Sequence, residues 1–129
     1  MTEAEKDMID INTIRKYSRI GDIMISVYVP CAESTNDAMS RLRDEFSRSS
    51  NIKSRDVMLD VTYGIELVML KLRSCDGIPV NGVVFFVGNI ADDEANRNMV
   101  MYAIEPSKSI KSFAYHRESS FYIDDDIFE

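Results

Sequence analysis

The feature that most constrains the fold is an uninterrupted apolar run, Val-Val-Phe-Phe-Val, at residues 83–87. A strand that is apolar on both faces must be covered on both faces, so the run predicts a central strand of a sheet. Asn81-Gly82 supplies a turn signal directly before it. The polar stretch at residues 91–97 predicts a hairpin loop that leads into a second strand at residues 99–104, which Pro106 terminates.

Two further regions have the composition of strands. Residues 24–29, Met-Ile-Ser-Val-Tyr-Val, predict a strand that ends at Pro30. Residues 112–116 and 120–123 predict one more strand or strand pair. The tail at residues 124–129 is expected to have no core of its own.

Three helices are expected beside these strands. The first covers residues 3–19 and ends at Gly21. The second follows a capping pair, Ser34 and Asp37, and runs to about Phe46, after which residues 47–50 are expected to form a loop. The third starts near Ser54 and is stopped by Gly77 and Pro79. Its apolar side chains recur every three or four positions, at Val57, Val61, Ile65, Val68 and Leu72.

This mixed order predicts a single-domain α/β sandwich of the α+β type, in which a mostly antiparallel sheet of about four strands is packed with about three helices. A chain of 129 residues suits one domain. No apolar run approaches the roughly 20 residues of a membrane span, and the acidic, polar N-terminus does not resemble a secretory signal. We therefore expect a cytoplasmic protein with no membrane partner, monomeric as an isolated domain.

Side chains typical of enzyme chemistry are scattered. The five glycines form no phosphate-binding loop, and no carboxylate pair is spaced for acid–base work. His116 has no nucleophile motif around it, so we expect it to be structural or surface-exposed. Cys31 and Cys75 with a single histidine make a poor zinc set. We expect no metal and no cofactor, and both thiols are interpreted as reduced packing residues.

The charge is unevenly distributed. The net charge of −7 is opposite to that of most nucleic-acid-binding modules. Residues 41–55, however, hold five basic and two acidic side chains, a local excess of three positive charges. A basic patch on an acidic domain can still follow a phosphate backbone.

Within this basic stretch, residues 49–55 predict an exposed loop of hydrogen-bonding side chains that enters a helix N-terminus. Such a terminus offers unpaired N–H groups and a partial positive charge to a phosphate or a base edge. Asn51 has a donor and an acceptor for one base edge, and Lys53 can only donate, which suits the reading of single-stranded RNA. On residue chemistry alone, a capped helix start with solvated Lys53 and Arg55 is the simpler interpretation.

The string Asn-Ile-Lys-Ser-Arg at residues 51–55 is also the signature tip of a known family, and its surroundings agree in register. Asp44-Glu45-Phe46 matches the family's D-E-F, residues 81–84 follow its strand pattern, and Glu105-Pro106 matches its E-P. Over about residues 8–123 the chain resembles the N-terminal domain of eukaryotic-type class 1 translation termination factors (peptide chain release factors).

The resemblance implies recognition of mRNA stop codons in the ribosomal decoding site, beside small-subunit ribosomal RNA. The tip that reads the first uridine falls on Asn51, Ile52, Lys53 and Ser54. The glutamate and the tyrosine that help admit purines at the next two positions fall on Glu45 and Tyr115. The tyrosine belongs to the family's Y-x-C-x-x-x-F, whose last residue falls on Phe121.

Three codon-facing elements depart from the family pattern. G-T-S has become Gly21-Asp22-Ile23, which loses both hydroxyls and adds a carboxylate. T-A-S ahead of the tip has become Arg48-Ser49-Ser50, which replaces a hydroxyl with a cation. The cysteine of Y-x-C-x-x-x-F has become Arg117. We hypothesise that the demand for a first uridine is kept and that discrimination at the later positions is altered.

Peptide release in this family depends on a G-G-Q loop in a middle domain, and a third domain binds a class 2 release-factor GTPase. The string G-G-Q is absent here, so residues 1–129 are expected to be the recognition domain of a longer protein and not an enzyme. Two alternatives remain. One is a Pelota-type ribosome-rescue domain, although such proteins generally lack the Asn-Ile-Lys-Ser tip. The other is a protein-interaction module that kept the fold and lost decoding.

Overall fold

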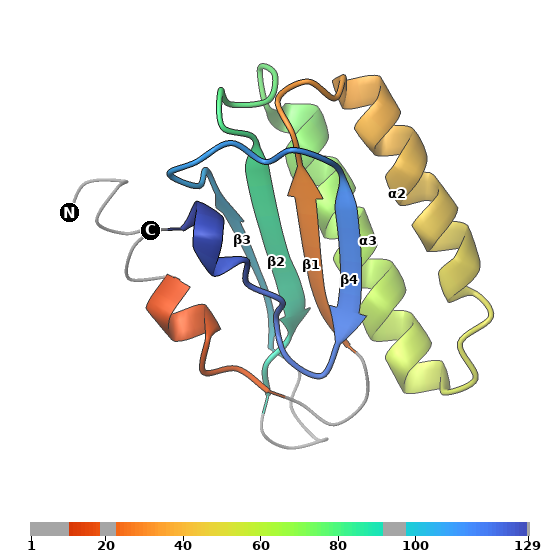
Figure 1. Ribbon diagram of the computed structural model, residues 1–129. Coiled ribbons are helices and arrows are strands. Elements are labelled where there is room, and N and C mark those ends of the chain that lie inside the picture. Colours follow the sequence, from red (N-terminus) through yellow and green to blue (C-terminus); the bar gives the residue numbers. More distant parts are fainter. Residues whose placement is uncertain (1–10, 19–22, 92–97, 129) are drawn as a thin grey trace.

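A four-stranded antiparallel sheet forms the middle layer of the fold (Figure 1). The computed structural model describes residues 11–18, 23–91 and 98–128. The strands are β1 (Met24–Val29), β2 (Val83–Asn89), β3 (Met99–Ile104) and β4 (Ala114–Glu118). They lie in the order β3-β2-β1-β4, so the apolar β2 is central and is buried along its whole length, as its composition requires. The predicted α+β sandwich is confirmed.

Two consecutive helices, α2 (Thr35–Ser49) and α3 (Arg55–Ser74), cover one face of the sheet (Figure 1). The hydroxyl of Ser34 caps α2 by accepting the N–H of Asp37 at 3.0 Å. The hydroxyl of Ser54 caps α3 by accepting the N–H of Val57 at 3.4 Å. Both predicted helix starts are confirmed.

The expected loop at residues 47–50 is wrong, because α2 continues to Ser49 and Ser50 caps its end. Serine hydroxyls sustain this last turn. Ser49 Oγ donates to the carbonyl of Phe46 at 2.5 Å, and Ser50 Oγ donates to the carbonyl of Ser47 at 2.8 Å. These bonds satisfy hydroxyls and helix-end carbonyls together, so a run of serines extends the helix instead of breaking it.

The sheet face toward α2 and α3 carries the first core. Cross-strand partners repeat along it: Val27 is opposite Phe85 on one side and Tyr115 on the other. The buried positions of α3 expected from its periodicity meet this face, including Val61, Val68 and Leu72. Tyr115 lies at the edge of this core and is half-buried.

The opposite face of the sheet is covered by the two ends of the described chain. Within residues 11–18, only 11–14 are helical, so the expected helix to residue 19 is too long at its C-terminal end. After a turn, Ser18 pairs with Ser120 in an isolated β-bridge. That bridge is all that forms of the second strand expected at residues 120–123. The remaining residues expected in the first helix, 3–10 and 19, lie outside the described ranges.

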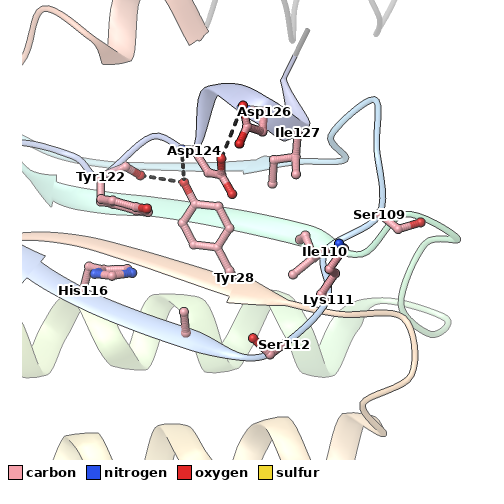
Figure 2. A pocket seen from close by; sticks show the side chains of 11 residues that line it. Tyr28, Ser109, Ile110, Lys111, Ser112, His116, Tyr122, Asp124, Asp126 and Ile127 are labelled. Atoms are coloured by element: carbon pink, nitrogen blue, oxygen red, sulfur yellow. Dashed lines mark hydrogen bonds between the residues drawn. The ribbon is translucent and has the colours of Figure 1, made fainter.

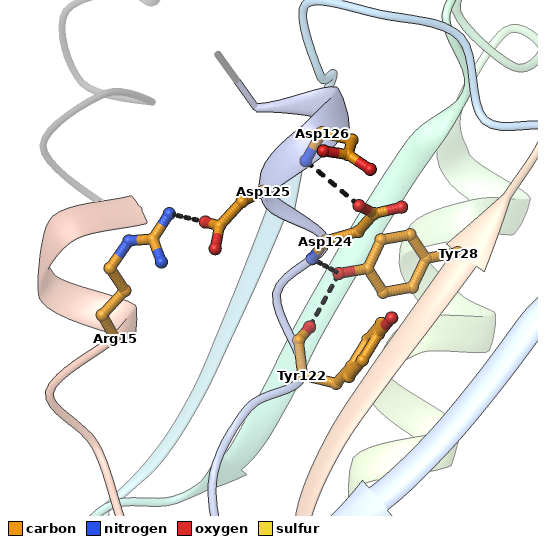
Figure 3. A network of polar contacts seen from close by, with 6 residues as sticks. All are labelled: Arg15, Tyr28, Tyr122, Asp124, Asp125 and Asp126. Carbon is orange, nitrogen blue, oxygen red and sulfur yellow. Dashed lines mark hydrogen bonds and ion pairs between the residues drawn. The ribbon is translucent and has the colours of Figure 1, made fainter.

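The tail has no core of its own, as expected, but it packs against the sheet. It forms a short 3-10 helix, η1 (Asp125–Ile127), and Ile127 and Phe128 pack into the second core. The hydroxyl of Tyr28 donates to the carbonyl of Tyr122 at 2.7 Å and accepts the N–H of Asp124 at 3.0 Å (Figure 3). An ion pair between Arg15 and Asp125 joins the tail to the N-terminal segment (Figure 3). The tail is therefore bound to the sheet through Tyr28 and to the N-terminal segment through Arg15.

The two thiols also differ from expectation. Cys31 and Cys75 are free, as expected, but both are exposed and are not packing residues. Cys31 lies in the turn after β1, with its Sγ 3.8 Å from the carbonyl oxygen of Ile78. Across the part of the chain that is described, no helix is both long and apolar enough to span a membrane.

Candidate nucleic-acid interface

The loop between α2 and α3 presents the predicted tip. Its path is held by the end of α2, because the N–H of Asn51 donates to the carbonyl of Arg48 and that of Ile52 to the carbonyl of Ser49, both at 3.1 Å. Ile52 is half-buried and packs against the first core. Asn51 and Lys53, its neighbours, are exposed. One apolar side chain thus anchors the loop, and the polar side chains on either side of it face solvent.

The N-terminus of α3 follows directly. Ser54 is the exposed capping residue. The N–H groups of Arg55 and Asp56 belong to the first turn, where helix geometry supplies no intrahelical acceptor. These donors suit an anion or a base oxygen, although the carboxylate of Asp56 already offsets part of the positive dipole end.

Glu45 on α2 lies within electrostatic reach of Tyr115 on the edge strand β4. The guanidinium of Arg41 lies over the ring of Phe113, 5.4 Å from its centroid, which places α2 beside the entry to β4. From Arg41 to Glu45 the helix advances by about 6 Å, and from Phe113 to Tyr115 the strand advances by a similar length. The contact between Arg41 and Phe113 therefore agrees with a position of Glu45 near Tyr115. Burial raises the pKa of Tyr115, and the negative charge of Glu45 raises it further. A phenol is protonated at neutral pH even without such a shift, so Tyr115 can donate as well as accept, and the raised pKa extends this to more alkaline pH.

Two cations border this pair of side chains. Arg48 forms an ion pair with Glu45 within α2, and the side chain of Arg48 is 70% exposed whereas that of Glu45 is 19% exposed. Arg117, two positions after Tyr115 on β4, lowers the pKa of the Tyr115 phenol and is therefore within electrostatic reach of it. The C-terminal ends of α2 and β4 thus gather one carboxylate, one phenol and two guanidinium groups.

Phe121 does not join this group. Its ring is only 6% exposed and packs in the second core, edge-on to Phe86 at 5.6 Å and to Tyr17 at 6.3 Å. That core lies on the opposite face of the sheet from Tyr115. The motif spacing is met, but the phenylalanine packs the core instead of facing solvent. Ser50 is exposed at the end of α2, and Gly21 and Asp22 lie outside the described residues.

Sequence reasoning missed a cavity of about 300 Å³ on the second face (Figure 2). It lies between the tail and the segment that leads into β4. His116 is half-buried there and stacks on Tyr122 with ring centroids 4.1 Å apart. The cavity is lined by Tyr28, Ser109, Ile110, Lys111, Ser112, Ala114, His116, Tyr122, Asp124, Asp126 and Ile127. No sequence signal marks it, because its walls come together only when the tail folds back over β1.

The cavity and the loop are separate sites. His116 and Tyr115 are neighbours on β4, so their side chains point to opposite faces of the sheet. The group of polar side chains at the ends of α2 and β4 is on the helix side, and the cavity is on the tail side. Among the described residues, no group of three His, Cys, Asp or Glu side chains is arranged to hold a metal ion.

With this geometry in place, known proteins identify the family. The family model described as eRF1 domain 1 matches residues 6–126. The chain therefore belongs to the eRF1 domain 1 family, and the expected N-terminal domain of a class 1 release factor is confirmed.

Individual relatives agree. Peptide chain release factor subunit 1 of Thermoplasma acidophilum is 38% identical over 104 residues, which is 81% of this chain and 25% of the relative. The protein of the same name from Methanococcoides burtonii is 34% identical over 113 residues, which is 88% of this chain and 27% of the relative. The crystal structure of the archaeal translation termination factor aRF1 matches with a TM-score of 0.81 and 25% identity, covering 98% of this chain and 34% of that one. The chain thus spans about a quarter of its curated relatives' length.

Proposed function

We propose that this domain serves translation termination by recognising stop codons in mRNA at the ribosomal decoding site. One observation carries the proposal. In a family whose curated relatives are release factors, the exposed Asn51 and Lys53 lie at one end of the helix hairpin, next to the group formed by Glu45, Arg48 and Tyr115. Small-subunit ribosomal RNA is the second RNA partner that this proposal implies.

Each side chain is assigned to a codon base according to the hydrogen-bond donors and acceptors that it carries. Asn51 and Lys53, on the anchored tip with Ile52 and Ser54, read the first uridine, whose carbonyl and imide groups need donors and an acceptor. Glu45 accepts from the exocyclic amine of adenine. Tyr115, which is protonated at neutral pH, donates or accepts beside it. Phe121 supports the site through the second core without touching RNA.

Recognition is the whole contribution of these residues. Residues 1–129 are the first domain of a longer factor, in which a middle domain with a G-G-Q loop performs peptidyl-tRNA hydrolysis and a further domain binds a class 2 release-factor GTPase. The three departures, at Asp22, Arg48 and Arg117, alter discrimination at the second and third codon positions.

The test joins residues 1–129 to the middle and C-terminal domains of an ordinary termination factor. Peptide release is then measured from ribosomes stopped at UAA, UAG, UGA and a sense codon. Release at any stop codon without release at the sense codon is the expected result, and unequal activity among the three would support altered discrimination. A folded, ribosome-bound chimera that releases nothing would overturn the proposal.

The net charge of −7 favours a second candidate, a protein-interaction module that lost decoding. The salt dependence of ribosome affinity distinguishes the stop-codon reader from the interaction module, because a phosphate-contacting domain loses affinity steeply as the salt concentration rises. A shallow salt dependence together with absent release would favour the interaction module. A Pelota-type rescue domain would instead bind ribosomes irrespective of the codon.

A further inference from the structure

The cavity beneath the tail has an apolar inner wall and charged groups near its opening (Figure 2). Tyr28 and Ile110 line it and are buried, whereas Lys111 and Asp126 also line it and are exposed. Its volume of about 300 Å³ is at the lower end of the range for small-molecule sites. The cavity therefore has the size and the mixed lining of a site for one small molecule.

The inner wall is formed largely by the ring of Tyr28. The hydroxyl of this residue donates to the carbonyl of Tyr122 at 2.7 Å and accepts the N–H of Asp124 at 3.0 Å (Figure 3). Because both bonds are made to the backbone of the tail, the aromatic ring is the part of Tyr28 that is left for a ligand. Ile110 and Ile127 add aliphatic side chains to the lining. This part of the cavity suits an apolar group.

Opposite charges line the cavity without pairing. Lys111 comes from the segment that leads into β4, and Asp124 and Asp126 come from the tail (Figure 2). Within residues 11–18, 23–91 and 98–128, neither Lys111 nor Asp126 has an ion-pair partner. Asp124 accepts the N–H of Asp126 at 3.1 Å through Oδ1 alone. The positive charge on one side of the cavity and the negative charges on the other can therefore both act on a ligand.

We propose that this cavity binds a small zwitterion of the α-amino acid class that carries an apolar side chain. The carboxylate of the ligand accepts from Lys111, its ammonium donates to Asp124 and Asp126, and its side chain lies against the ring of Tyr28. A simple amine of the same size would leave Lys111 beside a second positive charge. A simple carboxylic acid would leave the two aspartates beside a second negative charge.

This inference goes beyond the proposed stop-codon function and does not depend on it. The cavity is on the opposite face of the sheet from Tyr115 and from the core that anchors the loop through Ile52. A bound zwitterion would connect the tail to residues 109–112. Because it would bind only the folded chain, it should also raise the resistance of the fold to urea as its concentration increases.

The test is an NMR titration of the isotope-labelled chain, residues 1–129, with three probes that share one alkyl group. The probes are L-leucine, isopentylamine, which lacks the carboxylate, and isocaproate, which lacks the ammonium. L-leucine is expected to bind about tenfold or more tightly than either analogue, since each analogue loses one bond between charged groups. The amide signals that shift should belong to residues 109–112 and to the tail, and not to the loop at residues 50–54.

Two variants assign the charges. Lys111→Met keeps most of the side-chain length and removes the charge, so it should reduce the affinity for L-leucine to that for isopentylamine without weakening isopentylamine. Asp124→Asn keeps an acceptor for the N–H of Asp126, and it should weaken L-leucine without weakening isocaproate. Lys71→Met is the matched control, because it removes an exposed lysine from α3, far along the chain from the cavity lining. It should leave all three affinities unchanged.

Equal affinities for L-leucine and isopentylamine would show a simple cation site and would overturn the proposal. Binding of L-leucine that Lys111→Met and Lys71→Met weaken equally, or no binding of L-leucine at all, would overturn it as well. None of these results involves ribosomes or peptide release, so failure of this proposal and failure of the proposed function are distinguishable.

Discussion

The phenolic hydroxyl of Tyr28 on β1 donates a hydrogen bond to the backbone carbonyl of Tyr122, 94 positions later in the chain, at 2.7 Å. The same oxygen accepts the N–H of Asp124 at 3.0 Å (Figure 3). One side chain thus satisfies two backbone groups of the tail. The ring of Tyr28 also packs edge-on against Phe86, with ring centroids 6.4 Å apart, so the second core positions the hydroxyl that makes these bonds.

Removing this hydroxyl should loosen the tail without emptying the core. Tyr28→Phe leaves the carbonyl of Tyr122 and the N–H of Asp124 without their partner, which is expected to lower the free energy of unfolding by about 1–3 kcal/mol. Urea unfolding followed by circular dichroism measures the loss. Tyr63→Phe is the control, since Tyr63 is 47% exposed on α3, and its effect should stay within about 0.5 kcal/mol. Equal effects of the two variants would mean that the Tyr28 bonds contribute nothing.

Alkaline pH should destabilise the domain through Tyr28 and Tyr115. Burial is the main cause that raises the pKa of each phenol above the ordinary value of about 10. Each phenol keeps its proton in the folded state at a pH where the unfolded state has lost it, so stability is complete below about pH 10 and falls as the pH rises above it. Each group contributes a slope of up to about 1.4 kcal/mol per pH unit.

The measurement is urea unfolding at a series of pH values between about 9 and 11.5, the window around the ordinary tyrosine pKa of about 10. The slope for Tyr28→Phe should be about half that of the unmodified domain, because one of the two shifted phenols is gone. An unchanged slope would show that Tyr28 is not protonated preferentially in the folded state.

Much of the fold follows from local patterns in the sequence. Several elements depend only on residues that are close together in the chain, so they can be predicted from the sequence. They are the apolar strand β2, the periodic helix α3 and the helix caps at Ser34 and Ser54. The end of α2 was missed because Ser49 and Ser50 choose their acceptors only once a helix has formed.

The candidate site is predictable in part. The loop residues follow each other in the sequence, and the resemblance placed Glu45 and Tyr115 in the same group. The spacing of the Y-x-C-x-x-x-F motif does not determine which face of the sheet a residue beyond the strand packs against. Phe121 was therefore assigned to the site, although it packs in the second core. The cavity and the Tyr28 contacts join residues far apart in the chain, and no local pattern encodes them.

The turn before β2 depends on glycine at position 82. Gly82 has φ +88°, and an added Cβ would lie 2.5 Å from the carbonyl oxygen of Val29 and 2.9 Å from Cδ1 of Ile110. Gly77, at φ +113°, has no heavy atom within 4 Å of such a Cβ. Alanine at either position costs about 1–3 kcal/mol for the backbone conformation, and at Gly82 the overlap adds about 1–3 kcal/mol.

Comparing Gly82→Ala with Gly77→Ala in urea unfolding therefore isolates the overlap from the backbone cost. Gly82→Ala is expected to be the more destabilising of the two. Equal losses would mean that the contact with Val29 relaxes without cost, and the close approach of this turn to β1 would have no energetic role.

Lys53→Ala should reduce peptide release without changing the stability of the fold. The side chain of Lys53 is exposed on the loop, so the substitution should change the free energy of unfolding by no more than about 0.5 kcal/mol.

In the chimera, Lys53→Ala removes a charged donor to the first codon base. A hydrogen bond to a charged group is worth about 1.5–3 kcal/mol, so release at all three stop codons should fall by about 10- to 100-fold. Lys71→Ala removes another exposed lysine, from the opposite end of α3, and should leave release unchanged. If both variants released peptide at the rate of the unmodified chimera, Lys53 would be only a solvated residue at a capped helix start, and the first uridine would have to be read by other groups.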